Sequence, residues 1–193
     1  FGALLAVACF ILARIYGDLT DLPQALLAAG LLAAAGLAGG VMLLRRMPVP
    51  AVVGAVGLGL LGHAALAAGL VPRLSPLWLS TRTQAALERA RLLPAQGIAE
   101  APVTVAGYAE PSLVFALGTP TELAGPEEAA QAISENRPAV VEQREETAFR
   151  QALAARHAKP RLVATISGLD YSDGKKKTLR IYQSAASAAA TAR

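Results

Sequence analysis

The sequence predicts an α-helical membrane segment followed by a small α/β domain with a mixed sheet. Charge is the first observation behind this prediction: residues 1–72 carry five charged side chains, and residues 73–193 carry the other twenty-seven. The second is that the first part contains two uncharged apolar stretches, each as long as a membrane span. The third is that the second part alternates short helical and strand patterns, broken by proline, glycine and charge.

Composition excludes several other classes of protein. Hydrophobic residues make up 54% of the chain, which is too many for an intrinsically disordered protein. The net charge is only +4 and the basic residues are scattered, so no nucleic-acid partner is expected. Cys9 is the single cysteine and lies in an apolar run, so the chain can build neither a disulfide nor a cysteine-based zinc site.

Two apolar stretches, residues 22–44 and 48–72, are predicted to be transmembrane helices. A hydrocarbon core of about 30 Å needs about 20 helical residues, and an isolated span in lipid must satisfy its own backbone hydrogen bonds. Residues 1–15 hold an apolar run too short to span, and we interpret it as a third helix cut short. On this interpretation the chain is the carboxy-terminal end of a longer membrane protein; the alternative is a processed or engineered start.

The loops predict the orientation of these helices. Arg45 and Arg46 lie between the second and third apolar runs, and basic residues are retained on the cytoplasmic side. Residues 73–183 are therefore expected outside, in the periplasm if the cell has two membranes. The remaining residues 184–193 are small and polar, and we expect them to be a disordered tail.

Small residues and one histidine stand out within the spans. The spacings Gly36 to Gly40 and Ala55 to Gly59 fit small-xxx-small contact faces, although an alanine- and glycine-rich composition would produce them as well. His63 has two readings: a functional ionisable group, or a neutral histidine hydrogen-bonded to a neighbouring helix.

The soluble part is predicted to interleave helices and strands, which gives helices packed on a mixed sheet. Ser80 or Thr81 can cap the first helix, Trp78 before it suits the membrane interface, and an Asp-Gly pair marks the last turn. The expected helices are 82–92, 127–134 and 145–157; the expected strands are 103–108, 113–117, 137–142, 162–169 and 178–183.

The usual catalytic motifs are missing from this sequence. It has no glycine-rich phosphate loop after a strand and no His-Glu-x-x-His, and its two histidines, His63 and His157, lie in different parts of the chain. We therefore expect neither catalytic residues nor a set of metal ligands within these 193 residues.

Three segments resemble bacterial glycosyltransferase family 39, the polytopic enzymes related to protein mannosyltransferases and lipid A aminoarabinose transferases. Residues 105–119 are similar to its "GY-x-EPSLVF-x-LGT" segment. Residues 166–175 are similar to its terminal "GxNYSNG" hairpin, with Leu169-Asp170 in place of the common Phe-Asn, and residues 77–80 also fit. The three segments occur in order at plausible spacing, after helices that match the family's layout.

The resemblance implies a GT-C glycosyltransferase of the bacterial inner membrane. Such an enzyme moves a sugar from a polyprenyl-phosphate donor to a lipid, glycan or protein acceptor on the periplasmic face. The family's catalytic acids lie on its first external loop, which is absent here, and a divalent metal, if one is used, would be bound upstream as well. Asp18 and Asp21 belong to a later loop, and we do not transfer the catalytic role to them.

Within the soluble part, Tyr108 and Glu110 are the candidates for substrate-facing residues. Pro111 biases Glu110 toward an extended backbone, which could present its carboxylate at a loop tip. The alternative is structural: Glu110 fixes the turn and Tyr108 packs its ring. Residues 175–177, three consecutive lysines, could meet anionic headgroups or simply form a solvated strand edge.

A second function remains open at this point. The chain could be a non-catalytic, membrane-anchored periplasmic domain that binds a partner protein or an envelope polymer. Membrane lipids are a partner on either interpretation, whereas the sugar donor and the acceptor are partners only of the transferase.

Overall fold

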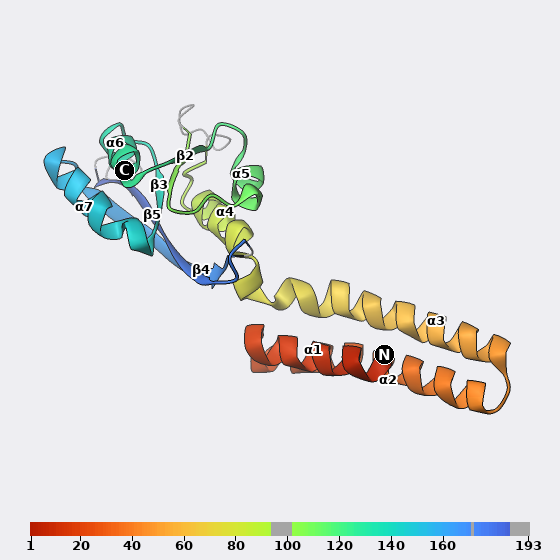
Figure 1. Cartoon of the computed structure of the whole chain (residues 1–193). Helices are drawn as coiled ribbons and strands as arrows, with labels where there is room; N and C mark the ends of the chain where they lie inside the picture. The colour runs from red at the N-terminus through yellow and green to blue at the C-terminus, as the bar shows by residue number, and fades with distance from the viewer. Residues whose placement is uncertain (94–101, 171, 186–193) are drawn as a thin grey trace. The chain divides into compact units, whose positions relative to one another are not determined.

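The computed structural model describes residues 1–93, 102–170 and 172–185, and its contacts divide the chain into two compact units, Phe1–Leu77 and Trp78–Arg193. Figure 1 shows the ribbon of the whole chain. The division falls five residues after the expected boundary at residue 72. Leu74 explains the difference, because its side chain is fully buried among residues of the first unit such as Cys9 and Leu70.

Three helices make up the first unit. The helix α2 has the predicted bounds, and the segment predicted at 48–72 begins as α3 and continues as a π-helix over Ala65–Leu70 and a 3-10 turn over Val71–Arg73. Together with their flanking turns, Leu19–Leu44 and Pro48–Arg73 are long and apolar enough to cross a membrane, whereas α1 is shorter. The helices are α1 (Gly2–Tyr16), α2 (Leu22–Leu44) and α3 (Pro48–Ala64).

The apolar side chains of these helices are mostly exposed. Only 22% of the most apolar window of Leu19–Leu44 and 11% of that of Pro48–Arg73 are buried. The core helix of a water-soluble protein would instead bury most of such a surface. The two long helices therefore have the exposure of segments surrounded by an apolar medium.

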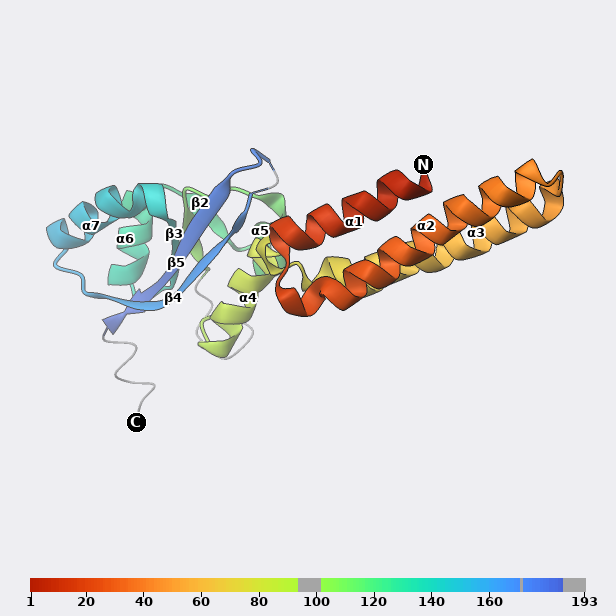
Figure 2. The ribbon, with the colours of Figure 1, turned by 90° about the horizontal axis from the view of Figure 1, so that it is seen from below.

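Small residues mediate the packing of these helices, and one member of each predicted pair, Gly36 and Ala55, takes part. Gly36 lies against the backbone of Gly2, and Gly39 approaches the Cβ atom of Ala55. A Cβ atom added at Gly40 or Gly59 would meet nothing within 4 Å. The helix α2 thus contacts α1 through Gly36 and α3 through Gly39. The two contacts lie on different faces of α2 because it packs against two neighbouring helices. Figure 2 shows α2 and α3 running side by side as a hairpin.

The hydrogen-bond partner of His63 lies on its own helix. Its Nδ1 atom is 2.8 Å from the carbonyl oxygen of Gly59, four residues earlier, and the side chain is exposed. This bond differs from the predicted one to a neighbouring helix, because the carbonyl oxygen one helical turn earlier is within reach of the imidazole ring.

A five-stranded mixed sheet forms the centre of the second unit, as the sequence predicts. Its strand order is β2-β1-β3-β5-β4; β1 is parallel to both β2 and β3, and β5 is antiparallel to both β3 and β4. The strands are β1 (Thr104–Ala106), β2 (Glu122–Ala124), β3 (Ala139–Glu142), β4 (Pro160–Leu169) and β5 (Lys176–Ser184).

Helices cover both faces of this sheet (Figures 1 and 2). On one face, Val105, Val140 and Leu179 pack against side chains of α4 and α5. On the other face, Val141 and Tyr182 pack against α6 and α7. Both faces are therefore apolar, which is why residues of these short strands are buried in succession rather than alternately. The helices are α4 (Leu79–Arg89), α5 (Pro111–Leu117), α6 (Pro126–Ser134) and α7 (Glu146–Ala155).

The strand predicted at residues 113–117 is wrong, because these residues form the helix α5. Leu113 is fully buried while Phe115 is 92% exposed, although both would lie on one face of a strand. Pro111 occupies the first helical turn, where a missing N–H costs no hydrogen bond. The strand that pairs with β1 is instead β2, which the apolar pattern of the sequence did not reveal.

The helix α4 begins at Leu79, earlier than predicted, and neither Ser80 nor Thr81 caps it. Leu79 and Leu87 are both buried, so helical packing extends to the first residue. The Ser80 hydroxyl instead lies 2.8 Å from that of Ser112. At the other end of the unit, β5 extends to Ser184; the predicted disordered tail beyond residue 185 lies outside the described residues, as does Tyr171.

Replacing Gly62 with alanine tests the packing of the first unit. The new Cβ atom would lie 2.7 Å from Cγ of Leu32 on α2, so we expect Gly62→Ala to lose about 1–3 kcal/mol of unfolding free energy. Gly57→Ala is the matched control, because nothing lies within 4 Å of the added atom. The measurement is loss of helical circular dichroism in micelles of rising sodium dodecyl sulfate content. Equal losses in the two variants would contradict the described helix contacts.

Candidate functional site

The carboxyl ends of β1 and β3 form the natural place for a site in this sheet. The chain leaves β1 through α5 toward β2 on one side, and leaves β3 through α7 toward β4 on the other. In open α/β sheets such a reversal leaves a crevice outside the carboxyl ends of the two strands. The tip of the β4–β5 hairpin lies at the same edge, because Glu142 at the end of β3 pairs with Leu179 near the start of β5.

Gly107, the residue after β1, holds two of these loops close together. Its φ angle is +81°, in the region that favours glycine. A Cβ atom at this position would lie 2.6 Å from Cγ of Glu145 and 2.9 Å from Cβ of Glu142. Both the backbone angle and the close approach therefore require glycine here.

Glu110 joins the β1–α5 loop to the hairpin. Its Oε1 atom accepts the backbone N–H of Ser172 at 2.8 Å. Oδ1 of Asp170 accepts the same N–H at 3.0 Å and the Ser172 hydroxyl at 2.6 Å. Two carboxylates from positions 60 residues apart thus converge on one amide, and both are buried.

A buried lysine, Lys177, offsets part of the negative charge of this cluster. Lys177 is only 7% exposed, and its Nζ atom lies 3.5 Å from Oδ2 of Asp170 and 3.2 Å from Oδ2 of Asp173. We use the name hairpin clamp for this group of five residues: Glu110, Asp170, Ser172, Asp173 and Lys177.

The clamp holds Asp170 in its ionised form. Burial by itself raises the pKa of Asp170, but the hydrogen bonds that its carboxylate accepts from the hydroxyl and the backbone N–H of Ser172, and the charge of Lys177, lower this pKa to about 2. A carboxyl group with such a pKa is ionised at neutral pH and does not serve as a general acid there. Asp170 is therefore suited to fixing the hairpin and orienting Lys177.

Tyr108 packs into the core on the other side of the same loop. Its ring is buried among Leu113, Val140 and other residues of that face, and its hydroxyl lies 3.4 Å from the Ser80 hydroxyl. The two predicted site residues, Tyr108 and Glu110, are thus both at the carboxyl edge, and both make contacts within the domain. These contacts agree with the structural alternative, while a part in substrate binding stays a prediction.

Sequence reasoning missed the role of Lys177. The three lysines at 175–177 suggested a solvated edge or a headgroup contact, yet Lys177 is buried in an ion-pair network. Its position two and four residues before the buried Leu179 and Ile181 was the available signal, since alternate residues of a strand share one face.

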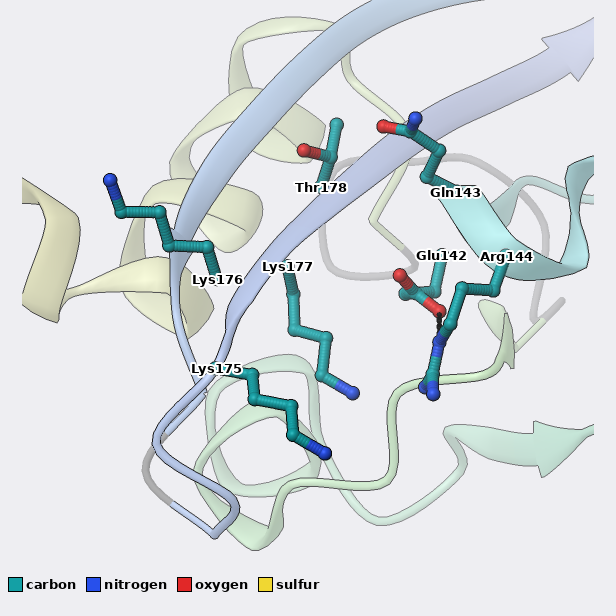
Figure 3. A pocket seen from close by; sticks show the side chains of 7 residues that line it. All are labelled: Glu142, Gln143, Arg144, Lys175, Lys176, Lys177 and Thr178. Atoms are coloured by element: carbon teal, nitrogen blue, oxygen red, sulfur yellow. Dashed lines mark hydrogen bonds and ion pairs between the residues drawn. The ribbon is translucent and has the colours of Figure 1, made fainter.

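A pocket of about 390 Å³ lies beside the clamp, between the end of β3 and the start of β5. Figure 3 shows the side chains that line it. In it, the buried carboxylate of Glu142 pairs with the Arg144 guanidinium at 2.5 Å. The lining residues are Glu142, Gln143, Arg144, Lys175, Lys176, Lys177 and Thr178.

Metal ligands are not gathered at this edge: among residues 1–93, 102–170 and 172–185, no group of three or more His, Cys, Asp or Glu side chains could hold a metal ion. Comparison of the chain with protein-family models, curated proteins and solved structures finds no match. The function must therefore be inferred from the residues and their geometry.

Acid unfolding of an Asp170→Asn variant tests the clamp. The pKa of Asp170 in the folded protein lies below the value near 3.9 of an unfolded chain, so its ionised form stabilises the fold above about pH 4. That contribution is lost as the pH falls toward 2. We expect Asp170→Asn to cost on the order of 2 kcal/mol at neutral pH and almost nothing near pH 2.

Urea unfolding at a series of pH values, followed by the fluorescence of Trp78, gives this difference directly. Trp78 is the only tryptophan and is the first residue of the second unit. Glu127→Gln on α6, where the native carboxylate is exposed, is the control for loss of a charge. A stability difference between wild type and Asp170→Asn that does not change with pH would contradict the assigned role.

Proposed function

We propose that the chain is the carboxy-terminal part of an integral-membrane glycosyltransferase of the GT-C type. It would move a sugar from a polyprenyl-phosphate donor to a lipid, glycan or protein acceptor on the outer face of the bacterial inner membrane. The observation that carries this proposal is a contact between the two main segments that resemble glycosyltransferase family 39. Glu110 in the first segment accepts the backbone N–H of Ser172 in the second, 62 positions later.

This contact supports the proposal because it explains why the two similar segments occur in the same chain. The first segment supplies the glycine, glutamate and proline that shape the β1–α5 loop, and the second supplies the turn that this loop holds. Residue types that must fit one another in space are expected to occur together in sequence. Two unrelated chance matches would have no reason to meet.

The first unit supports a membrane location. Its long helices expose apolar side chains over lengths that suit a bilayer. A polyprenyl donor keeps its tail in lipid, so the enzyme that uses it must present its site at the membrane surface. Arg45 and Arg46 between α2 and α3 favour the cytoplasmic side for that turn, which would place the second unit outside.

The chemistry assigns the second unit a supporting part in the reaction. A phosphate leaving group departs readily, so such an enzyme mainly needs a carboxylate to activate the acceptor and cations to hold the phosphate. The carboxylate is expected in the upstream part of the protein. The second unit would exclude water and help to select the acceptor, with Tyr108 and Glu110 shaping the loop that does so.

Cysteine labelling in spheroplasts tests the orientation. In a Cys9→Ala background, we expect a membrane-impermeant maleimide to label Lys176→Cys in the second unit. It should label Arg45→Cys, in the turn after α2, only after the membrane is permeabilised. The reverse pattern would overturn the orientation, and labelling of both positions in intact spheroplasts would show that α3 does not span.

Transfer assays with the full-length protein test the activity. Membranes are supplied with radiolabelled polyprenyl-phosphate mannose or aminoarabinose, and label in the lipid, glycan and protein fractions is counted. We expect Glu110→Ala to lower kcat/KM about tenfold or more, because the loop that it holds is displaced. Glu127→Ala, at an exposed position on α6, should retain the rate.

The outcomes separate the two functions considered for this chain. Deleting residues 78–193 while insertion is intact should abolish transfer if the unit belongs to the catalytic assembly. Full activity after this deletion would confine the second unit to binding a partner. Absence of transfer from every donor in the wild-type protein would contradict the transferase proposal itself.

A further inference from the structure

Cationic side chains make up most of the lining of the pocket beside the hairpin clamp. Four of its seven lining residues are cationic, and the one acid among them, Glu142, is buried and paired with Arg144. The pocket lies at the carboxyl edge of the sheet, where α/β proteins commonly bind ligands. Its cations come from two elements, the turn after β3 and the start of β5, that the fold brings together.

Three of the cationic groups face the same space. Figure 3 shows the ammonium groups of Lys175 and Lys177 and the guanidinium of Arg144 pointing to one side of the hairpin, whereas Lys176 points to the opposite side. The side chains of Lys175 and Arg144 are 75% and 64% exposed, so their charged groups can reach a ligand at little cost in desolvation.

The clamp fixes the position of the third cation. Lys177 is held by Asp170 and Asp173, so its ammonium group is placed before any ligand arrives. Lys175 has a longer contact, 4.0 Å, with the same Asp173. A bound anion would therefore compete with the Asp173 carboxylate for Lys175 and Lys177.

We propose that this pocket binds a phosphate group through Lys175, Lys177 and Arg144. A phosphate offers several charged oxygens in a tetrahedral arrangement, which suits point charges from lysines combined with the planar fork of an arginine. A single carboxylate has only two oxygen atoms, whereas a phosphate has enough oxygen atoms to contact all three cationic groups at once. Gln143 adds a neutral amide donor at the rim.

This site stands on the second unit alone and does not depend on the transferase proposal. The same phosphate chemistry occurs in the headgroup of a lipid and in a free phosphate or diphosphate. The two sources differ in whether the ligand is held in the bilayer, and an experiment can separate them on that basis.

Equilibrium dialysis of the full chain in nanodiscs measures the binding. The nanodiscs contain phosphatidylcholine only, and the probe is radiolabelled inorganic pyrophosphate. We expect saturable binding that is about fivefold weaker in Lys175→Gln, since one exposed charge contact is lost. Lys176→Gln removes the same charge from the adjacent residue, whose ammonium group points away, and should leave the affinity unchanged.

A gain of affinity is expected when the counter-ion is removed. Oδ1 of Asp173 accepts the backbone N–H of Lys175 at 2.9 Å, and asparagine preserves this bond while losing the charge. Asp173→Asn should therefore bind pyrophosphate about threefold more tightly. Glu127→Gln, which removes a negative charge from the exposed face of α6, should not.

Each outcome decides a point. Absence of saturable pyrophosphate binding would overturn the proposal. Equal loss of affinity in Lys175→Gln and Lys176→Gln would also overturn it, because the binding would then be a general attraction of anions to positive charge. When the site binds, replacing part of the phosphatidylcholine by phosphatidic acid distinguishes the sources. Competition by phosphatidic acid would assign the site to a membrane headgroup, and undiminished pyrophosphate binding would assign it to a soluble phosphate. Because no sugar transfer is measured, failure of the transferase assay leaves this result intact.

Discussion

Apolar side chains that the protein itself does not cover set the main constraint on this chain. The long helices of the first unit bury only a small part of their surface within the described residues, and their exposed side chains suit an apolar surrounding. In such a medium the backbone must satisfy its own hydrogen bonds, and helices do this within a single segment. The small number of charged side chains in residues 1–72 suits the same surrounding.

The two edges of the sheet in the second unit use their charges differently. At the amino edge, Arg137 donates to Glu122 and to Glu135, and the hydrogen bond from Arg137 holds the pKa of Glu122 below its usual value. Arg137 thus forms an ion pair with each of these two acids. At the carboxyl edge, the hairpin clamp fixes Lys177 while leaving Lys175 directed to a pocket. The two edges thus differ in how their charged side chains are arranged.

Several elements could be predicted because local signals and tertiary packing agree. The bounds of α2, the hairpin of β4 and β5, and α6 after Gly125-Pro126 follow from hydropathy and turn chemistry. The helix α5 was mistaken for a strand because Val114 and Phe115 have high strand propensity. The helix forms instead because Leu113 is buried in the core and Pro111 suits the first helical turn. The strand β2 escaped prediction because a three-residue edge strand carries almost no pattern.

The sequence alone determined where charge is absent, which segments are long enough to span, and that helices and strands interleave afterwards, because hydropathy and periodicity are local properties. It also singled out Tyr108 and Glu110 through the motif that contains them. Only the tertiary structure decided what these residues contact. The meeting of Glu110 with Ser172, the burial of Lys177 and the pocket beside them depend on strand order and on the register of β3 with β5. Order and register arise from contacts between residues far apart in the chain, and no single segment of sequence encodes them.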